Sequence, residues 1–114
     1  MKDNETADKI QDIQILEQNL QSLTMQKQSF QMELNEIINA LAEFTKAGDE
    51  IYRILGGIMM RADKNSLNSE LEDKKKVLEI RISSIEKQEK ILEKKTGDLR
   101  EEISKAITDD KPKH

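Results

Sequence analysis

Apolar residues between positions 9 and 44 recur with alternating spacings of three and four residues. Ten positions follow this spacing, and nine of them are apolar. They are Ile13, Leu16, Leu20, Leu23, Lys27, Phe30, Leu34, Ile37, Leu41 and Phe44. A 3.5-residue period sustained over this length is typical of a coiled coil, in which a helix packs one apolar seam against a partner helix. The pattern therefore predicts a long helix over about 9–45 with a single packing face.

Lys27 is the polar exception on this seam. Two interpretations are open. A polar seam residue can mark the register of a helix pair, or the long side chain can carry its ammonium group past the seam into water. We take the second interpretation as the expectation.

A second helix is predicted over about 66–107 by apolar residues that recur every seven positions. They are Leu71, Leu78, Ile85, Leu92, Leu99 and Ala106. The companion stripe is expected at positions 74, 81, 88, 95 and 102, which are polar, with Val77, Ile82, Ile91 and Ile103 beside it. Gly97 costs about 1 kcal/mol relative to alanine inside a helix, so the turns around it are expected to be looser. The tail at 108–114 is expected to be disordered.

Capping residues set the expected ends of both helices. Thr6 or Asp8 is the expected N-cap of the first helix, and Gly48 is the expected left-handed residue after its last turn. Candidate N-caps of the second helix are Asp63, Asn65 and Ser66.

Between the helices, the stretch from Gly48 to Ser66 predicts a β hairpin at about 50–62. A two-residue turn at Gly56 and Gly57, both free to adopt positive φ, sets the strand register. In that register Leu55 faces Ile58, Ile54 faces Met59, Arg53 faces Met60, Tyr52 faces Arg61, and Ile51 faces Ala62. Both faces of the ribbon then carry apolar side chains.

An isolated two-stranded hairpin is marginal in water and leaves two strand edges unpaired. We therefore interpret this hairpin as an assembly element that pairs with copies of itself or with a sister chain. The expected subunit-interface residues are its apolar members: Ile51, Tyr52, Ile54, Leu55, Ile58, Met59 and Met60.

Together these patterns predict a mainly α fold made of one domain over residues 1–114. Because a hairpin returns the chain on itself, the two helices are expected to lie antiparallel as a long two-helix coiled coil with a central β hairpin. The chain termini are then expected to meet at the end of the coil away from the hairpin.

Composition and charge exclude several classes of function. Charged residues make up 37% of the chain with a net charge of -4, and the run Lys74 to Lys76 is surrounded by acids. No one-sided basic surface of the kind that binds nucleic acid is present in the sequence. The sequence has no cysteine, and its longest mostly apolar run, Ile54 to Met60, is too short to cross a bilayer. We expect a cytoplasmic protein without nucleic-acid or membrane partners.

Catalysis is not expected either. The single histidine, His114, lies in the terminal tail, and the serines have no base partner at helical spacing. The many carboxylates alternate with lysines at positions that support a helix. We expect no catalytic, cofactor-binding or metal-binding residues.

Several short motifs, taken in order around a lone central hairpin, resemble the beta subunit of prefoldin, particularly the archaeal type. They are Gln26-Lys27-Gln28, Leu34-Asn35-Glu36, Glu50-Ile51-Tyr52, Glu79-Ile80-Arg81 and Lys87-Gln88-Glu89. The resemblance covers roughly residues 9 to 107. It implies a heterohexamer of two alpha and four beta subunits, whose hairpins form an oligomeric β barrel with six coiled coils extending from it.

The resemblance also implies a function. Prefoldin is an ATP-independent holdase that grips unfolded polypeptides at the tips of its coiled coils and delivers them to a group II chaperonin, with no cofactor. Carried onto this chain, the client-binding tip residues are Ile10, Ile13, Leu99, Ile103 and Ile107. The alternative is a coiled-coil scaffold or tether that joins partners without binding clients. The concentration of apolar residues in the predicted hairpin favours the holdase over the scaffold.

Overall fold

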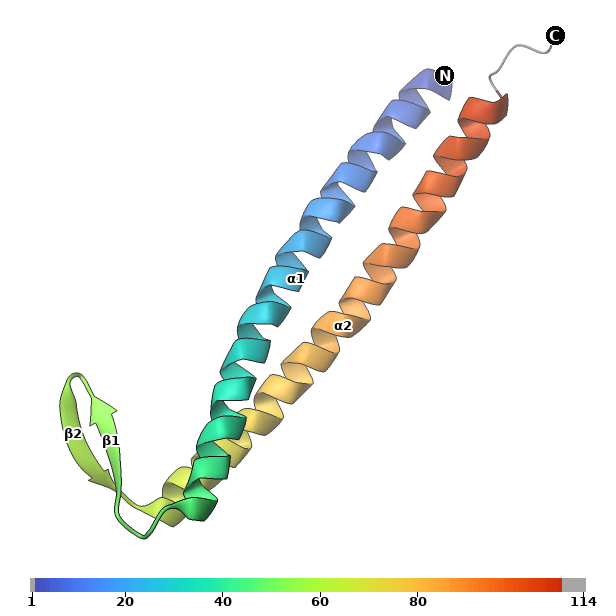
Figure 1. Cartoon of the computed structure of the whole chain (residues 1–114). Helices are drawn as coiled ribbons and strands as arrows, with labels where there is room; N and C mark the ends of the chain where they lie inside the picture. The colour runs from blue at the N-terminus through green and yellow to red at the C-terminus, as the bar shows by residue number, and fades with distance from the viewer. Residues whose placement is uncertain (1, 110–114) are drawn as a thin grey trace. The chain divides into compact units, whose positions relative to one another are not determined.

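Two long helices joined by a β hairpin make up the part of the chain that the computed structural model describes, residues 2–109 (Figure 1). The order is α1 (Lys2–Lys46), β1 (Ile51–Leu55), β2 (Ile58–Ala62) and α2 (Lys64–Asp109). The predicted mainly α fold with a single central hairpin is confirmed. The predicted barrel concerns an oligomer and stays a prediction.

α1 begins earlier than the seam pattern indicated. It starts at Lys2 rather than near residue 9, so Thr6 and Asp8 lie inside the helix and the expectation that either is its N-cap was wrong. The added residues include neither proline nor glycine, and acidic side chains near a helix N-terminus interact favourably with its dipole. Helix formation therefore extends to the N-terminal side of Ile13, the first apolar seam residue.

The C-terminal end of α1 also differs from the expectation. Gly48 does not adopt a positive φ, so it is not a left-handed cap. The amide of Ala47 still donates to the carbonyl of Glu43 at 3.0 Å. The carbonyl of Ala47 accepts a hydrogen bond from Nζ of Lys64 at 2.9 Å. A side chain from the start of α2 thus satisfies a backbone carbonyl just after the end of α1.

Asp63 is the N-cap of α2. Its Oδ2 accepts a hydrogen bond from the backbone amide of Ser66 at 3.0 Å. Hydrogen bonding to Ser66, first by its side chain and then by this amide, lowers the pKa of the Asp63 carboxyl. Asn65 and Ser66, the other candidates, lie in the first turn. At the other end α2 runs to Asp109, and Thr108 donates to the carbonyl of Ser104 at 2.9 Å. Residues 108 and 109 are therefore helical, while the rest of the predicted disordered tail, 110–114, lies outside the described residues.

The hairpin has the predicted register at every pair. Leu55 lies opposite Ile58 and the pairing continues to Ile51 opposite Ala62. Gly56 and Gly57 have φ values of 56° and 82°. A Cβ added at either position would meet nothing within 4 Å, so the turn requires glycine for its backbone conformation and not for space.

The chain divides into two compact units, of which one is residues 28–83. Its core is a cluster of side chains from both helices, with Leu34 and Ile37 on α1 packed against Leu78 and Ile82 on α2. Phe30, Leu41 and Leu71 are half-buried around this cluster. The guanidinium of Arg81 on α2 lies over the ring of Phe30 on α1, 5.6 Å from its centroid, a cation–π contact between the two helices.

The other unit consists of residues 1–27 and 84–114. In its described part, α1 and α2 lie side by side and antiparallel (Figure 1). Lys9 pairs with Glu102 at 3.4 Å, and Arg100 pairs with Glu17. The seam residues Ile13, Leu16, Leu20 and Leu23 on α1, and Leu92 and Leu99 on α2, are half-buried, as predicted.

The companion stripe of α2 was predicted one residue too early. Positions 74, 81, 88, 95 and 102 are exposed, and the buried or half-buried positions are 75, 82, 89, 96 and 103. A heptad allows the second seam position to follow the first by three residues or by four. In α2 it follows by four, which brings Ile82 and Ile103 into the seam together with Lys75, Glu89 and Thr96.

The corrected stripe explains why a lysine, Lys27, lies in the seam of α1: it faces Glu89 of α2. Its Nζ lies 2.8 Å from Oε1 of Glu89, and the hydroxyl of Thr24 donates to Oε2 of the same carboxylate at 3.0 Å. The hydrogen bond from Lys27 lowers the pKa of Glu89, and the same bond raises the pKa of Lys27. Lys27 therefore has a specific partner in the seam, and the expectation that it merely reaches past the seam into water was wrong.

Candidate assembly and client-binding sites

The hairpin carries a dense group of exposed apolar side chains. Six of the seven predicted interface residues are exposed, from Leu55 at 50% to Ile54 at 68%. Ile51 differs, because it is 8% exposed and already covered within the chain. Large apolar surface left in water on a folded protein is typical of an interaction site.

The strand pairing divides these side chains between two faces. Tyr52, Ile54 and Met59 share one face with Arg61, since side chains alternate along a strand. Leu55, Ile58 and Met60 lie on the opposite face, together with the covered Ile51. The sheet has only these two strands, so each has one edge without a strand partner among the described residues. Apolar faces and open edges both suit contact with another chain.

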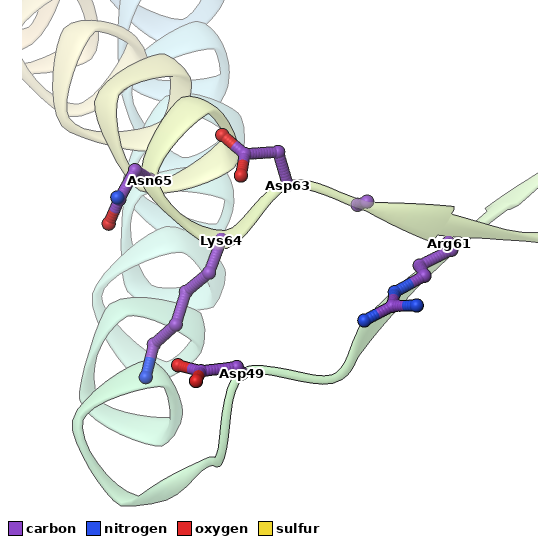
Figure 2. A pocket seen from close by; sticks show the side chains of 6 residues that line it. Asp49, Arg61, Asp63, Lys64 and Asn65 are labelled. Carbon is purple, nitrogen blue, oxygen red and sulfur yellow. The ribbon is translucent and has the colours of Figure 1, made fainter.

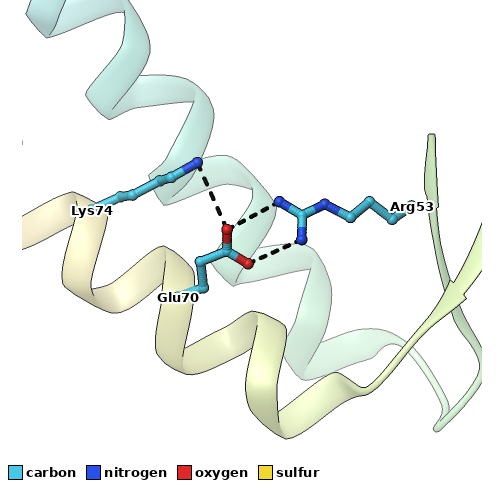
Figure 3. Close-up of polar contacts among 3 residues, drawn as sticks. All are labelled: Arg53, Glu70 and Lys74. Carbon is cyan, nitrogen blue, oxygen red and sulfur yellow. Dashed lines mark hydrogen bonds and ion pairs between the residues drawn. The ribbon is translucent and has the colours of Figure 1, made fainter. Parts of the chain in front are cut away.

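Arg53 connects the hairpin to α2. Its two terminal nitrogens lie 3.1 and 3.0 Å from the two carboxylate oxygens of Glu70, and Nζ of Lys74 lies 4.0 Å from the same carboxylate (Figure 3). The hydrogen bonds from Arg53 lower the pKa of Glu70. A bidentate pair of this kind restricts geometry more than a single contact does. It therefore helps to hold β1 at a defined orientation to α2.

A small cavity of about 200 Å³ lies where the hairpin meets the start of α2. Leu55 and Met60 from the hairpin line it together with Leu67, and the Arg53–Glu70 pair forms part of its wall. The hairpin face that carries these residues is thus partly occupied by its own helix.

A second, larger cavity of about 640 Å³ lies at the base of the hairpin (Figure 2). Its charged lining residues are Asp49, Arg61, Asp63 and Lys64. Asp63 caps α2, and Lys64 donates to the carbonyl of Ala47. Two acids and two cations balance, and half of these groups have structural partners, so the cavity shows no arrangement for acid–base or nucleophilic chemistry.

The predicted tip residues lie toward the N-terminal end of α1 and the C-terminal end of α2, within the unit made by 1–27 and 84–114. The Lys9–Glu102 pair brings these ends together as predicted. Ile13, Leu99 and Ile103 are half-buried in the seam, whereas Ile10 and Ile107 are exposed. Of these five predicted tip residues, Ile10 and Ile107 are therefore the two that are exposed in the closed coil.

Sequence reasoning missed two polar contacts. Glu89 was not recognised as a seam residue, although a four-residue step from Ile85 leads to it. The Arg53–Glu70 pair joins residues 17 positions apart on different elements, and no sequence pattern signals it. Within residues 2–109, no group of three or more histidine, cysteine or acidic side chains is arranged to hold a metal ion. Neither α1 nor α2, over its described length, is long and apolar enough to cross a membrane.

Comparison with known proteins defines the class to which this arrangement belongs. The sequence model described as "Prefoldin subunit" matches residues 7–110. The chain therefore belongs to the prefoldin subunit family. Members of that family are chaperones, which confirms the expectation that the chain is not an enzyme.

Among individual proteins, the chain is similar to archaeal beta subunits. It is 36% identical over 97 residues to prefoldin subunit beta of Saccharolobus islandicus strain L.S.2.15, covering 83% of this chain and 77% of that protein. It is 38% identical over 93 residues to prefoldin subunit beta of Thermococcus onnurineus strain NA1, covering 80% of each. The resemblance inferred from the short motifs is thereby confirmed.

Solved structures agree with the sequence comparison. The crystal structure of the prefoldin beta subunit from Thermococcus strain KS-1 matches with a TM-score of 0.83 and 30% identity over 95% of both chains. The beta2 subunit from the same strain matches with a TM-score of 0.61 and 24% identity, over 82% of this chain and 95% of that one, which supports the fold alone.

Proposed function

We propose that this chain is a subunit of an ATP-independent holdase that captures unfolded polypeptides and delivers them to a group II chaperonin in the cytoplasm. The observation that carries the proposal is the hairpin with six exposed apolar residues, found in a member of the prefoldin subunit family. The proposed activity uses no cofactor, metal ion or nucleotide.

Assembly is the first part of the proposal. The hairpin residues Tyr52, Ile54, Leu55, Ile58, Met59 and Met60, with Ile51 beneath them, form contacts with neighbouring subunits. The proposed complex contains two alpha and four beta subunits, with this chain as beta, and its hairpins close into a β barrel. Support comes from the exposure of both hairpin faces and the two open strand edges, since barrel closure removes such edges.

Client binding is the second part. The exposed side chains of Ile10 and Ile107 make first contact with an unfolded chain. Ile13, Leu99 and Ile103 contribute when the terminal turns separate, because helix ends open at low free-energy cost. Several weak sites on several coiled coils of one complex raise the overall affinity by multivalency.

An aggregation assay tests this proposal. The chain is mixed with an alpha subunit, a chemically denatured protein is diluted into the mixture without ATP, and light scattering is followed. Suppression of scattering is the expected result. Removing residues 1–13 and 99–114 should abolish it while the mass of the complex falls only by the deleted residues.

The same experiment separates the proposal from the alternative of a scaffold or tether. A scaffold assembles normally but leaves the scattering of the denatured protein unchanged. Suppression that survives removal of both helix ends would instead contradict the tip assignment.

A further inference from the structure

The two buried polar residues among those described, Glu89 and Thr96, differ in what they require from a partner. Thr96 is 4% exposed, and its hydroxyl donates to the carbonyl of Leu92 in its own helix at 2.8 Å. Thr96 is therefore satisfied whatever packs against α2. Glu89 is 9% exposed, and its carboxylate is bound by Thr24 and Lys27, both on α1. Glu89 therefore depends on the identity of the facing helix.

Apolar packing alone does not decide which helices pair. Both α1 and α2 carry apolar seam residues at heptad spacing, so two copies of α1, or two copies of α2, could bury a comparable seam. The chain contains both helices in every molecule. The complex proposed above would bring several such seams into one particle, so a further determinant is needed there to favour α1 against α2.

Charge at the seam supplies this determinant. In a parallel pair of identical helices, each seam position faces its own copy. Two α1 helices would bring Lys27 against a second Lys27, and two α2 helices would bring Glu89 against a second Glu89. Both residues lie near the middle of their helices, Lys2–Lys46 and Lys64–Asp109, so like charges also approach each other in a fully overlapped antiparallel pair. Like charges facing each other in a partly dry seam are strongly unfavourable.

We propose that Thr24, Lys27 and Glu89 form a polar layer that selects pairing of α1 with α2 and prevents pairing of like helices from two copies of this chain. The layer acts on partner choice and not mainly on stability. Replacing a buried ion pair by well-packed apolar residues is often neutral or stabilising, whereas removing one partner leaves an uncompensated charge.

Single cysteines can report like-helix pairing, because the sequence has no cysteine of its own. Leu34 and Ile82 belong to one core cluster and lie one heptad from Lys27 and Glu89, respectively. Full-length chains carrying Leu34→Cys or Ile82→Cys are equilibrated in a glutathione buffer. Disulfide-linked dimers, separated on a denaturing gel, then measure pairing of α1 with α1 or of α2 with α2.

The first experiment compares three versions of the layer in each cysteine background: native, Lys27→Leu with Glu89→Leu, and Lys27→Glu with Glu89→Lys. The apolar double variant should raise the linked-dimer fraction at least about fivefold without lowering the melting temperature. The charge-swapped double variant should match the native chain, because it restores a complementary pair and still places like charges together in like-helix pairs. An unchanged dimer fraction in the apolar variant overturns the proposal.

A second experiment tests partner choice between chains. Chains with Lys27→Glu and Leu34→Cys are mixed with chains that carry Glu89→Lys and Ile82→Cys. Within each chain the layer then holds two like charges, whereas α1 of the first chain is complementary to α2 of the second. Mixing should produce a disulfide-linked mixed dimer well above the level formed by the same single cysteines with the native layer. The absence of that mixed dimer contradicts the proposal.

Discussion

The hairpin and the helical seam of residues 28–83 use the same kinds of side chain in opposite ways. Leu78 in the seam is 4% exposed, whereas Ile54 in the hairpin is 68% exposed. The seam finds its partner within the chain, because the two helices present complementary apolar stripes to each other. The two hairpin strands satisfy each other's hydrogen bonds but cannot cover both of their own faces.

This difference separates residues that stabilise the subunit from residues available to other chains. Burial of an apolar side chain contributes about 1.5–3 kcal/mol relative to leaving it in water. The seam side chains make that contribution when the chain folds. The hairpin side chains can make it only when a second chain covers them.

The largest expected effect is on assembly. Leu55→Asp combined with Ile58→Asp should release the subunit from its complex, because each aspartate would have to be desolvated in the contact. Helix content by circular dichroism should stay near the native value. Light scattering measures the particle mass.

Met25→Asp combined with Met32→Asp is the matched control for the hairpin variant. Both methionines are exposed on α1, and the chemical change is similar. Full-size particles are expected for this control. Full-size particles in the hairpin variant would show that these hairpin positions do not bind other subunits.

The next largest effect is on subunit stability. Leu78→Ala should cost about 2–5 kcal/mol of unfolding free energy, since it removes buried atoms and leaves a cavity. Ile80→Ala, two residues along the same helix but exposed, should change the unfolding free energy by less than about 0.5 kcal/mol. Chemical denaturation followed by circular dichroism gives both values. Equal losses of unfolding free energy in the two variants would show that the buried and exposed faces of α2 do not differ in their contribution to stability.

A smaller effect is expected at the helix ends. Ile10→Ser with Ile107→Ser should weaken suppression of aggregation several-fold while the assembled mass stays unchanged. The control is Ile15→Ser with Ile91→Ser, which removes two other exposed isoleucines from α1 and α2. The aggregation assay without ATP compares the two. If the control is equally weakened, client binding is not concentrated at the predicted tip residues.

The smallest effect is a pH dependence from the polar layer. The hydrogen bond from Lys27 lowers the pKa of Glu89 below its ordinary value of 4.5. A carboxylate whose pKa is lowered in the folded state stabilises it above the unfolded-state pKa and loses that contribution as pH falls through the folded-state value. The melting temperature of the native chain should therefore fall more steeply below about pH 4.5 than that of Glu89→Gln.

Glu79→Gln is the control for the pH measurement, since Glu79 is an exposed acid on the same helix and is not among the groups that act on Lys27. Its melting curve should keep the steep fall of the native chain. Parallel curves for Glu89→Gln and the native chain would show that the layer does not contribute in this pH range.

Much of the fold could be predicted because it depends on local rules. The heptad spacing of α1 identified the seam positions from Ile13 to Phe44, and two adjacent glycines defined the hairpin register through their positive φ values. The errors arose where two local solutions had similar free energies. A second seam position three or four residues after the first is equally compatible with a helix, and only the position of the facing helix decided for Glu89 over Gln88.

The sequence by itself determined two helices, a hairpin of defined register and a family resemblance, since each follows from residue spacing along one segment. The tertiary structure alone decided which polar residues meet. Lys27 and Glu89 are 62 residues apart, and Arg53 and Glu70 are 17 apart, on elements whose approach depends on packing. Tertiary packing also decided that Ile51 is buried while the other apolar hairpin residues are exposed. In the same way it left Ile10 and Ile107 exposed while the other predicted tip residues are half-buried, because burial depends on what lies opposite each side chain.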